Sequence, residues 1–196
     1  MTLAERLRAA LETQHDPILL TGDFHDFDPD EVTRPAAVLI PVTDRADPGV
    51  ILTVRNANMR RHAGQIAFPG GRIDPEDDGP IDAALREAEE EIALPRSAVQ
   101  VIGTGDRYRT VTGYCVTPVI GVVTPDLVLR PAEAEVAEVF EVPLSFLLNR
   151  DNHVEGSADY QGQMRRFYEI PWEGRHIWGA TAAMIVNLSK RLQWTA

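Results

Sequence analysis

The sequence predicts an α+β fold in which a mixed β-sheet is packed between helices, as in an α/β/α sandwich. Two observations support this fold class. Short runs of β-branched and apolar residues recur along the chain, and amphipathic segments with helical periodicity lie between some of them. The two kinds of segment do not alternate strictly, so the sheet is expected to be mixed rather than wholly parallel.

The chain is long enough for one ordinary domain. Its 196 residues, 44% of them hydrophobic, can bury a sizeable core, whereas two full domains would be cramped. Residues 1–16 are typical of an amphipathic helix, and the acidic, turn-rich residues 21–33 are typical of a surface connection. We therefore expect an N-terminal helix and acidic connection over residues 1–33 and the main domain over residues 34–196. The apolar stripe of the N-terminal helix consists of Leu3, Leu7 and Leu11.

The main domain is expected to begin with two neighbouring strands and to end with a helix. Strand candidates share β-branched, apolar or aromatic residues and lie at 36–42, 49–55, 65–71, 98–103, 114–123, 136–142, 163–172 and 176–179. A helix is expected from Pro80 to about Ala93, because Pro80 suits the first helical position and Pro95 discourages continuation. Further helices are expected at 143–148 and 180–194. The last helix should bury Met184, Ile185, Leu188 and Leu192.

The composition excludes several classes of partner. A formal net charge of −11 and a pI near 4.9 argue against bulk DNA, RNA or an anionic membrane surface, because the mean field of the protein repels polyanions. A small anionic substrate remains compatible if a cation and a few arginines reverse the sign locally. The single cysteine, Cys115, fits a reducing compartment, and the N-terminus lacks the apolar core of a signal peptide. We therefore expect a soluble, cytoplasmic protein.

The helix expected from Pro80 concentrates negative charge on one face. At 100° per residue, Glu87, Glu90 and Glu91 fall within roughly one third of the helical circumference. Like charges at this spacing repel one another. Hard divalent cations would offset the repulsion, since Mg²⁺ prefers carboxylate and phosphate oxygens. A separate apolar stripe is expected to pack on the sheet, and it consists of Ile81, Ala84, Leu85, Ala88 and Ile92.

The helix alone leaves a second interpretation open. A solvated acidic face with Arg86 as its partner is also consistent with these residues, and Glu89 points elsewhere, toward solvent. The preceding stretch "FPGG" favours the metal site. A strand that ends in Gly70 and Gly71 lets the backbone approach a ligand closely and turn tightly before the helix.

These residues resemble a known family signature. The stretch "GGRIDPEDDGPIDAALREAEEEIAL" is similar to the Nudix box, in which a glycine, five residues, a glutamate and seven residues precede R-E-U-x-E-E-x-G-U, with U an aliphatic residue. The second half matches at Arg86, Glu87, Ala88, Glu90, Glu91 and Leu94. The first half departs from the pattern. Gly71 lies fifteen positions before Arg86 instead of fourteen, Asp78 stands where glutamate is usual, and Ala93 replaces the glycine.

The upstream segment narrows the resemblance. "LTVRNANMRRHAGQIAFPGG", residues 52–71, is similar to the second signature of the coenzyme A diphosphatase group of Nudix hydrolases. Asn56 and Met59 depart from that signature, at a serine and a leucine. The matching positions are Arg55, Arg60, His62, Gly64, Gln65, Phe68, Pro69, Gly70 and Gly71. The segments "VTGYCVTPVIG" and "EVAEVFEVPL" also resemble this group, whereas residues 1–33 show no such likeness.

The resemblance implies the Nudix fold and a hydrolase that depends on Mg²⁺ or Mn²⁺. It implies that Glu87, Glu90 and Glu91 bind the metal. Among the box carboxylates Glu90 is the preferred general base, and Glu135 in the later loop is the alternative that the resemblance implies.

Structural support of this site would come from two residues of the box. By resemblance, Arg86 orients the helix through an internal ion pair, and Asp78 occupies the position of the usual glutamate. The substrate contacts implied by the upstream signature are Arg55, Arg60, His62, Gln65, Gly70 and Gly71. Arg61 is better explained as a surface charge.

The implied reaction is hydrolysis of the pyrophosphate bond of coenzyme A or its thioesters, which gives 3′,5′-ADP and 4′-phosphopantetheine or its acyl derivative. One alternative keeps the enzyme but changes the substrate to ADP-ribose, a dinucleotide or a nucleoside triphosphate. Another alternative is a non-catalytic sensor of a small ligand on the same fold. The three intact glutamates argue against a sensor. The residues leave open the preference between free and acylated coenzyme A, the metal used in the cell and the oligomeric state.

Overall fold

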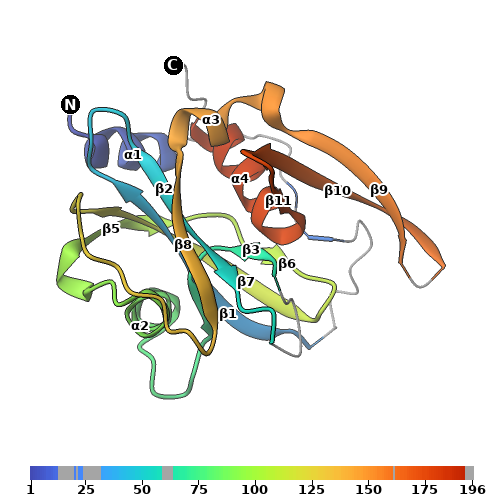
Figure 1. Cartoon of the computed structure of the whole chain (residues 1–196), viewed down its shortest axis with the longest axis horizontal. Helices are drawn as coiled ribbons and strands as arrows, with labels where there is room; N and C mark the ends of the chain where they lie inside the picture. Colours follow the sequence, from blue (N-terminus) through green and yellow to red (C-terminus); the bar gives the residue numbers. More distant parts are fainter. Residues whose placement is uncertain (13–19, 21, 24–31, 59–63, 161, 193–196) are drawn as a thin grey trace.

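The computed structural model describes residues 1–12, 20, 22–23, 32–58, 64–160 and 162–192. These residues form a mixed eight-stranded sheet with helices on both faces, and a second sheet of three strands beside it (Figure 1). The expected α/β/α sandwich is therefore confirmed. The N-terminal connection expected at residues 21–33 lies mostly outside the described residues.

The larger sheet has the order β3-β2-β1-β7-β5, with β4 beside β1, β6 beside β7 and β8 beside β2. Only the central pair β1 and β7 is parallel, and the other pairs are antiparallel. Its strands are β1 (Arg34–Thr43), β2 (Gly49–Arg55), β3 (Ile66–Ala67), β4 (Gly70–Arg72), β5 (Val99–Thr104), β6 (Tyr108–Arg109), β7 (Tyr114–Val123) and β8 (Val136–Pro143).

The first half of β1 pairs with β4, whereas its far end pairs with β2 at Val42 and Val50. The strands β2 and β4 therefore occupy different parts of the same side of β1. This arrangement places the start of β4 near the end of β2, and both strands contribute to the site described below.

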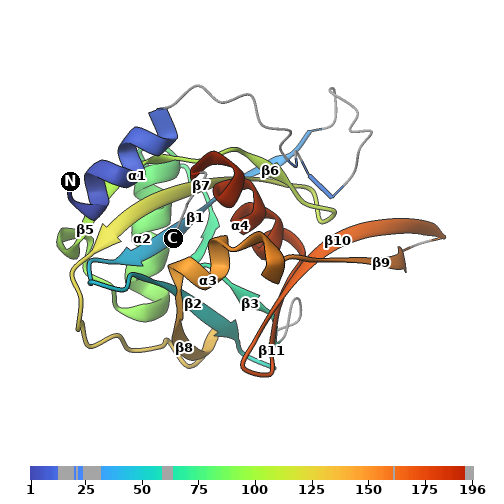
Figure 2. The ribbon, with the colours of Figure 1, turned by 90° about the horizontal axis from the view of Figure 1, so that it is seen from above.

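Helices cover the two faces of the larger sheet unequally. Helix α2 (Pro80–Ile92) packs alone on one face, where its alanines join a core cluster with Ala37, Leu39 and Val119. Helices α1 (Leu3–Glu12), α3 (Leu144–Leu148) and α4 (Gly179–Leu192) pack on the other face, as the view from above shows (Figure 2). The 3₁₀ turns η1 (Arg96–Ala98) and η2 (Arg150–Asn152) follow α2 and α3.

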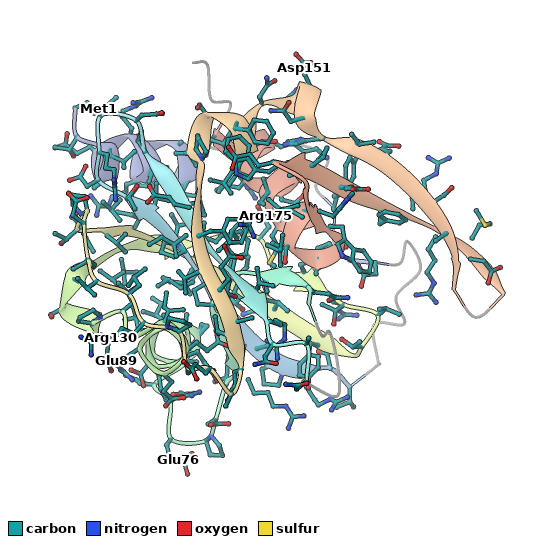
Figure 3. The ribbon with its side chains drawn as sticks, viewed as in Figure 1. Met1, Glu76, Glu89, Arg130, Asp151 and Arg175 are labelled. Carbon is teal, nitrogen blue, oxygen red and sulfur yellow. The ribbon has the colours of Figure 1, made fainter. Side chains whose placement is uncertain are left out.

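The three-stranded sheet was expected only in part. It consists of β9 (Val154–Tyr160), β10 (Gln163–Trp172) and β11 (Arg175–Trp178). The sequence predicted the last two strands, but neither β9 nor β6, and it did not predict a separate sheet. The far end of the β9–β10 hairpin projects from the body of the protein (Figure 1). Arg175 of β11 connects the two sheets through a two-pronged ion pair with Glu138 of β8 (Figure 3).

The packing stripes predicted from helical periodicity are confirmed except at one residue. Leu3 and Leu7 are buried and Leu11 packs against the same cluster, while the inward face predicted for α4 is buried throughout. Ile81, expected in the apolar stripe of α2, is instead 39% exposed. Of the described helices, none has the length and apolar character needed to cross a membrane.

Candidate active site

Helix α2 carries two of the three predicted glutamates toward β4. The helix begins with Pro80 at its first turn and ends at Ala93, whose left-handed backbone (φ 55°) terminates it. The Gly70 N–H donates to Oε2 of Glu91 at 3.0 Å. A Cβ on Gly71 would lie 2.6 Å from Cδ of Glu87, so only glycine leaves room for that carboxylate. The glycine pair therefore serves to bring backbone and carboxylates together.

The carboxyl of Glu91 is buried, and few groups around it offset its negative charge. Its exposure is 5%, and burial raises the pKa of its carboxyl to about 7. The Gly70 N–H and Arg55 act in the opposite direction, with Nη1 of Arg55 at 4.0 Å from Oε1, while the charges of Glu87 and Glu135 add to the rise. A carboxyl held in this way is stabilised when a cation binds beside it.

Glu87, one helical turn earlier, has a similar environment. Burial is the main cause that raises the pKa of its carboxyl, and the charges of Glu90 and Glu135 contribute in the same direction. Arg86 opposes the rise through a hydrogen bond from Nη1 at 3.1 Å. Both acids that face β4 are therefore destabilised as anions in the absence of a cation.

Glu87, Glu90 and Glu91 form an acidic ridge on α2. Arg86 is the centre of an ion-pair network at the outer side of this ridge. Its Nε and Nη2 donate to the two oxygens of Asp77 at 2.8 and 3.0 Å, and Nη2 also donates to the Arg72 carbonyl at 3.1 Å. This pairing lowers the pKa of the Asp77 carboxyl to about 2. The network ties the loop before α2 to the helix, which is the supporting contact that the resemblance implied for Arg86.

The prediction for Asp78 requires correction. The acid that contacts Arg86 is Asp77, one residue earlier, whereas Asp78 is exposed and its N–H donates to Asp82. Asp77 lies six positions after Gly71, which is the usual spacing of the box glutamate. The extra residue of this loop therefore follows Asp77, in the turn at Asp78 and Gly79 that leads into the helix.

Glu90 differs from the other two ridge acids. Its side chain is 60% exposed and accepts a hydrogen bond from Nη1 of Arg86 at 3.1 Å. Here the second interpretation of the acidic helix holds in part, because this carboxylate has an arginine partner at the surface. Glu89 is also solvated, as expected, and it lies on the outer side of α2, where it pairs with Arg96 (Figure 3).

The loop that carries Glu135 is fastened to the same helix. The N–H groups of Arg130 and Ala132 donate to the carbonyls of Ile92 and Glu91, which gives partners to two of the last carbonyls of α2. On its other side, the Asn56 N–H donates to the Glu135 carbonyl at 2.8 Å and the Asn56 amide donates to the Glu133 carbonyl. The exposed Glu135 is thereby held where its charge acts on Glu87 and Glu91.

The structure brings together some of the predicted substrate residues. Arg55 ends β2 beside Glu91, and its N–H donates to the Gln65 carbonyl at 2.9 Å. Gly70 and Gly71 lie next to the carboxylates as described above. Arg60 and His62, together with Arg61, lie outside the described residues. Sequence reasoning missed Asp77 and treated Asn56 only as a tolerated replacement, although it anchors the Glu135 loop.

The donor set fits a divalent metal. Within the described residues, no three His, Cys, Asp or Glu side chains converge as a finished metal site. Glu87 and Glu91 nevertheless face the same strand with raised pKa values, and Arg86 neutralises only part of their charge. Oxygen donors of this kind suit Mg²⁺ or Mn²⁺, which would relieve the repulsion.

Comparison with known proteins identifies the family. Residues 33–160, which include β4, α2 and the Glu135 loop, match the model of the NUDIX domain. The chain belongs to the Nudix family. Nudix hydrolases act on substrates that contain a pyrophosphate, and they generally use divalent metals.

Two curated relatives support this membership. The protein named uncharacterized Nudix hydrolase NudL from Escherichia coli K12 is 46% identical over 159 residues, which cover 81% of this chain and 83% of the relative. The protein of the same name from Shigella boydii serotype 4 is 47% identical over the same length. A solved MutT/nudix family protein from Enterococcus faecalis has a TM-score of 0.50 at 13% identity. The matched region covers 97% of this Nudix chain and 68% of the Enterococcus faecalis chain. This likeness is evidence for the fold and for nothing beyond it.

Proposed function

We propose that this Nudix hydrolase cleaves the pyrophosphate bond of coenzyme A or its thioesters, releasing 3′,5′-ADP and 4′-phosphopantetheine or its acyl derivative. The observation that supports the proposal is the meeting of two motifs at one carboxylate. Arg55 from the upstream signature and Gly70 from its end both lie against Glu91 of the Nudix box. Two residues of the segment that resembles the coenzyme A diphosphatase group therefore lie beside a carboxylate of the box.

In this proposal, Glu87, Glu90 and Glu91 hold Mg²⁺ or Mn²⁺. The metal would supply a Lewis acid for the diphosphate oxygens and lower the pKa of a bound water. Glu87 and Glu91 are the better supported ligands, because they face β4 and burial raises the pKa of both carboxyls, whereas Glu90 is 60% exposed. Glu90 would have to release Arg86 to join them.

The choice of general base favours Glu135 over Glu90. Oε2 of Glu90 accepts a hydrogen bond from Nη1 of Arg86 at 3.1 Å, so this carboxylate is held by an arginine and is less available to a water molecule. Glu135 is exposed on a loop anchored at both ends, and its charge already acts on the two buried acids. From that position its carboxylate can accept the proton of an attacking water.

The remaining residues of the upstream signature would bind the substrate. Arg55 is 25% exposed and can turn part of its guanidinium toward a phosphate, for which its planar fork is suited. Gly70 and Gly71 would allow the diphosphate to approach the backbone of β4. The same binding role is proposed for Arg60, His62 and Gln65 from the signature.

The test is a substrate panel with purified full-length protein. Coenzyme A, acetyl-coenzyme A, ADP-ribose and NADH are incubated with and without Mg²⁺, and the products are separated by chromatography. We expect metal-dependent formation of 3′,5′-ADP from coenzyme A or its thioester. Cleavage of ADP-ribose with coenzyme A left intact would overturn the substrate assignment but not the family.

Single substitutions in the same assay distinguish the two candidate bases. Glu135→Gln is expected to reduce kcat by about a hundredfold or more, within the usual contribution of a general base, with a small change in KM. Glu90→Gln is expected to have the smaller effect on the pH dependence of kcat. If Glu135→Gln retains the kcat and pH profile of the unmodified protein, Glu135 is not the base.

A further inference from the structure

Two arginines gather around one tyrosine on the side of β4 that faces away from α2. Nε and Nη2 of Arg72 donate to the Tyr114 hydroxyl at 3.1 and 3.0 Å. The guanidinium of Arg34 lies 4.8 Å from the centroid of the same ring, and its Nη2 donates to the Thr112 carbonyl at 3.4 Å. Tyr114 therefore has two guanidinium groups at 4.8 and 5.7 Å from its ring centroid, and both carry a positive charge that an anion could offset.

Neither arginine forms an ion pair with a carboxylate of the described residues. Arg45, which is 41% exposed, differs from them because its guanidinium reaches two carboxylates. Both Arg34 and Arg72 are exposed, so each guanidinium keeps N–H donors that a ligand can use.

Strand register explains why this cluster lies across β4 from the acidic ridge. Arg72 pairs with Ala36, and Arg34 pairs with Tyr114. Ala36 belongs to the core beneath α1 and α4, so Arg72 points to that face, and residues two positions apart on a strand share a face. Gly71, between Gly70 and Arg72, faces Glu87 instead.

The cluster is nevertheless adjacent to the candidate active site. The carbonyl of Arg72 accepts a hydrogen bond from Arg86, and Gly70, two residues earlier, binds Glu91. Two residues of extended strand span about 7 Å. Within the described residues, β4 pairs only with β1, so no other strand uses the backbone groups of its second edge.

We propose that Arg34 and Arg72, positioned by Tyr114, bind a second anionic group of the substrate, namely the phosphate monoester on its ribose. The inference rests on the proposed function and names the residues that would make the enzyme prefer substrates with this extra phosphate. Guanidinium groups recognise phosphate oxygens through paired hydrogen bonds. Two of them together match the double negative charge of a phosphate monoester, whereas a diphosphate without that group would leave the cluster unused.

The experiment compares coenzyme A with 3′-dephospho-coenzyme A as substrates at saturating Mg²⁺. Arg34→Gln and Arg72→Gln are each expected to raise KM for coenzyme A about tenfold, the effect of losing a charge-assisted contact. The KM for the dephosphorylated substrate and kcat for both should stay unchanged. Arg45→Gln is the matched control, because it removes one exposed positive charge beyond the opposite end of β1. This control should change neither KM nor kcat for either substrate.

The possible results separate this inference from the proposed function. Equal changes in KM for both substrates, or no change for either, would overturn the phosphate site while leaving the diphosphatase intact. If the unmodified protein cleaves neither substrate, the proposed function fails. Titration calorimetry with 3′,5′-ADP and 5′-AMP then decides the inference. Tighter binding of 3′,5′-ADP that is lost in Arg72→Gln supports the site, and equal affinity of both nucleotides refutes it.

Discussion

Replacing the buried acid of the ridge is expected to make the metal-free protein more stable while it abolishes turnover. Glu91 is 5% exposed, and its pKa rises from the ordinary 4.5 to about 7 in the folded state. The folded state therefore binds more protons than the unfolded state between these values. Stability is highest below pH 4.5, falls as pH rises toward 7, and is then constant with respect to this group.

The size of the effect follows from the same difference. A change in pKa from 4.5 to about 7 corresponds to roughly 3 kcal/mol that ionised Glu91 costs the folded protein at pH 8. Glu91→Gln removes this cost and keeps a side-chain oxygen for the Gly70 N–H. It loses the long ion pair with Arg55, which contributes at most about 1 kcal/mol. We expect a net gain of about 2 kcal/mol, or roughly 4–8 °C in Tm for a chain of this length.

Urea and thermal unfolding of the EDTA-treated protein at pH 5 and pH 8 measure this gain. Glu89→Gln is the matched control, because it removes a charge from the same helix at a side chain that is 52% exposed. The control should change stability little at either pH. The reasoning is refuted if Glu91→Gln is less stable than the unmodified protein at pH 8, or if the two respond identically to pH. Added Mg²⁺ should stabilise the unmodified protein more than the variant.

Three further predictions concern the loop before α2, the end of α2 and the glycine of β4 that faces Glu87. Asp77→Asn should destabilise the protein by about 2 kcal/mol in urea unfolding and lower kcat, since Arg86 loses its paired acceptor, whereas Asp78→Asn should do neither. Ala93→Gly should raise stability by about 0.5 kcal/mol in the same assay, because a left-handed backbone favours glycine more than its added chain entropy disfavours it. Gly71→Ala should reduce kcat by about tenfold or more with little loss of Tm, because the new Cβ displaces a flexible carboxylate rather than backbone.

The acidic helix was the part of the site that the sequence could predict well. Prolines at both ends set its length, and the expected range of Pro80 to about Ala93 agrees with the observed Pro80–Ile92. Periodicity placed Glu87 and Glu91 on one ridge. It did not predict that β4 covers this ridge and buries part of it. The exposure of Ile81 shows that the buried face of α2 is rotated toward the glutamates.

The partner of Arg86 could not be decided from spacing alone. A one-residue insertion can be accommodated at any point of a loop, and the count from Gly71 to Arg86 does not show where. The hydrogen bonds place it after Asp77, which keeps the usual distance from Gly71. The spacing between Gly71 and Asp77 could have predicted this partner of Arg86. The strand fixes the position of Gly71, and the acid must lie where its side chain reaches Arg86 on the helix.

Contacts between segments that are distant in the sequence could not be predicted for a different reason. Asn56 holds the Glu135 loop, and Tyr114 of β7 orders Arg72 of β4, across 42 positions in the second case. Such pairs depend on strand register across the whole sheet, and neither local periodicity nor a linear motif encodes that register. The same limit explains why the separate sheet with β9 was not predicted, since β9 has few apolar residues and, in the part of the chain that the structure describes, pairs only with β10.

The fold offsets the negative charges of the acids on and near α2 to different degrees. The difference distinguishes acids held by Arg86 from Glu91, which is left to bind the proposed metal. Arg86 holds Asp77, Glu87 and Glu90 by direct hydrogen bonds, so part of their negative charge is balanced without any further cation. Glu91 receives one backbone N–H and a guanidinium at 4.0 Å, which leaves most of its burial uncompensated. An arginine placed closer to Glu91 would stabilise the fold but would occupy the space of a metal. The incomplete pairing of Glu91 is therefore the feature that makes a dication the favourable partner at this position.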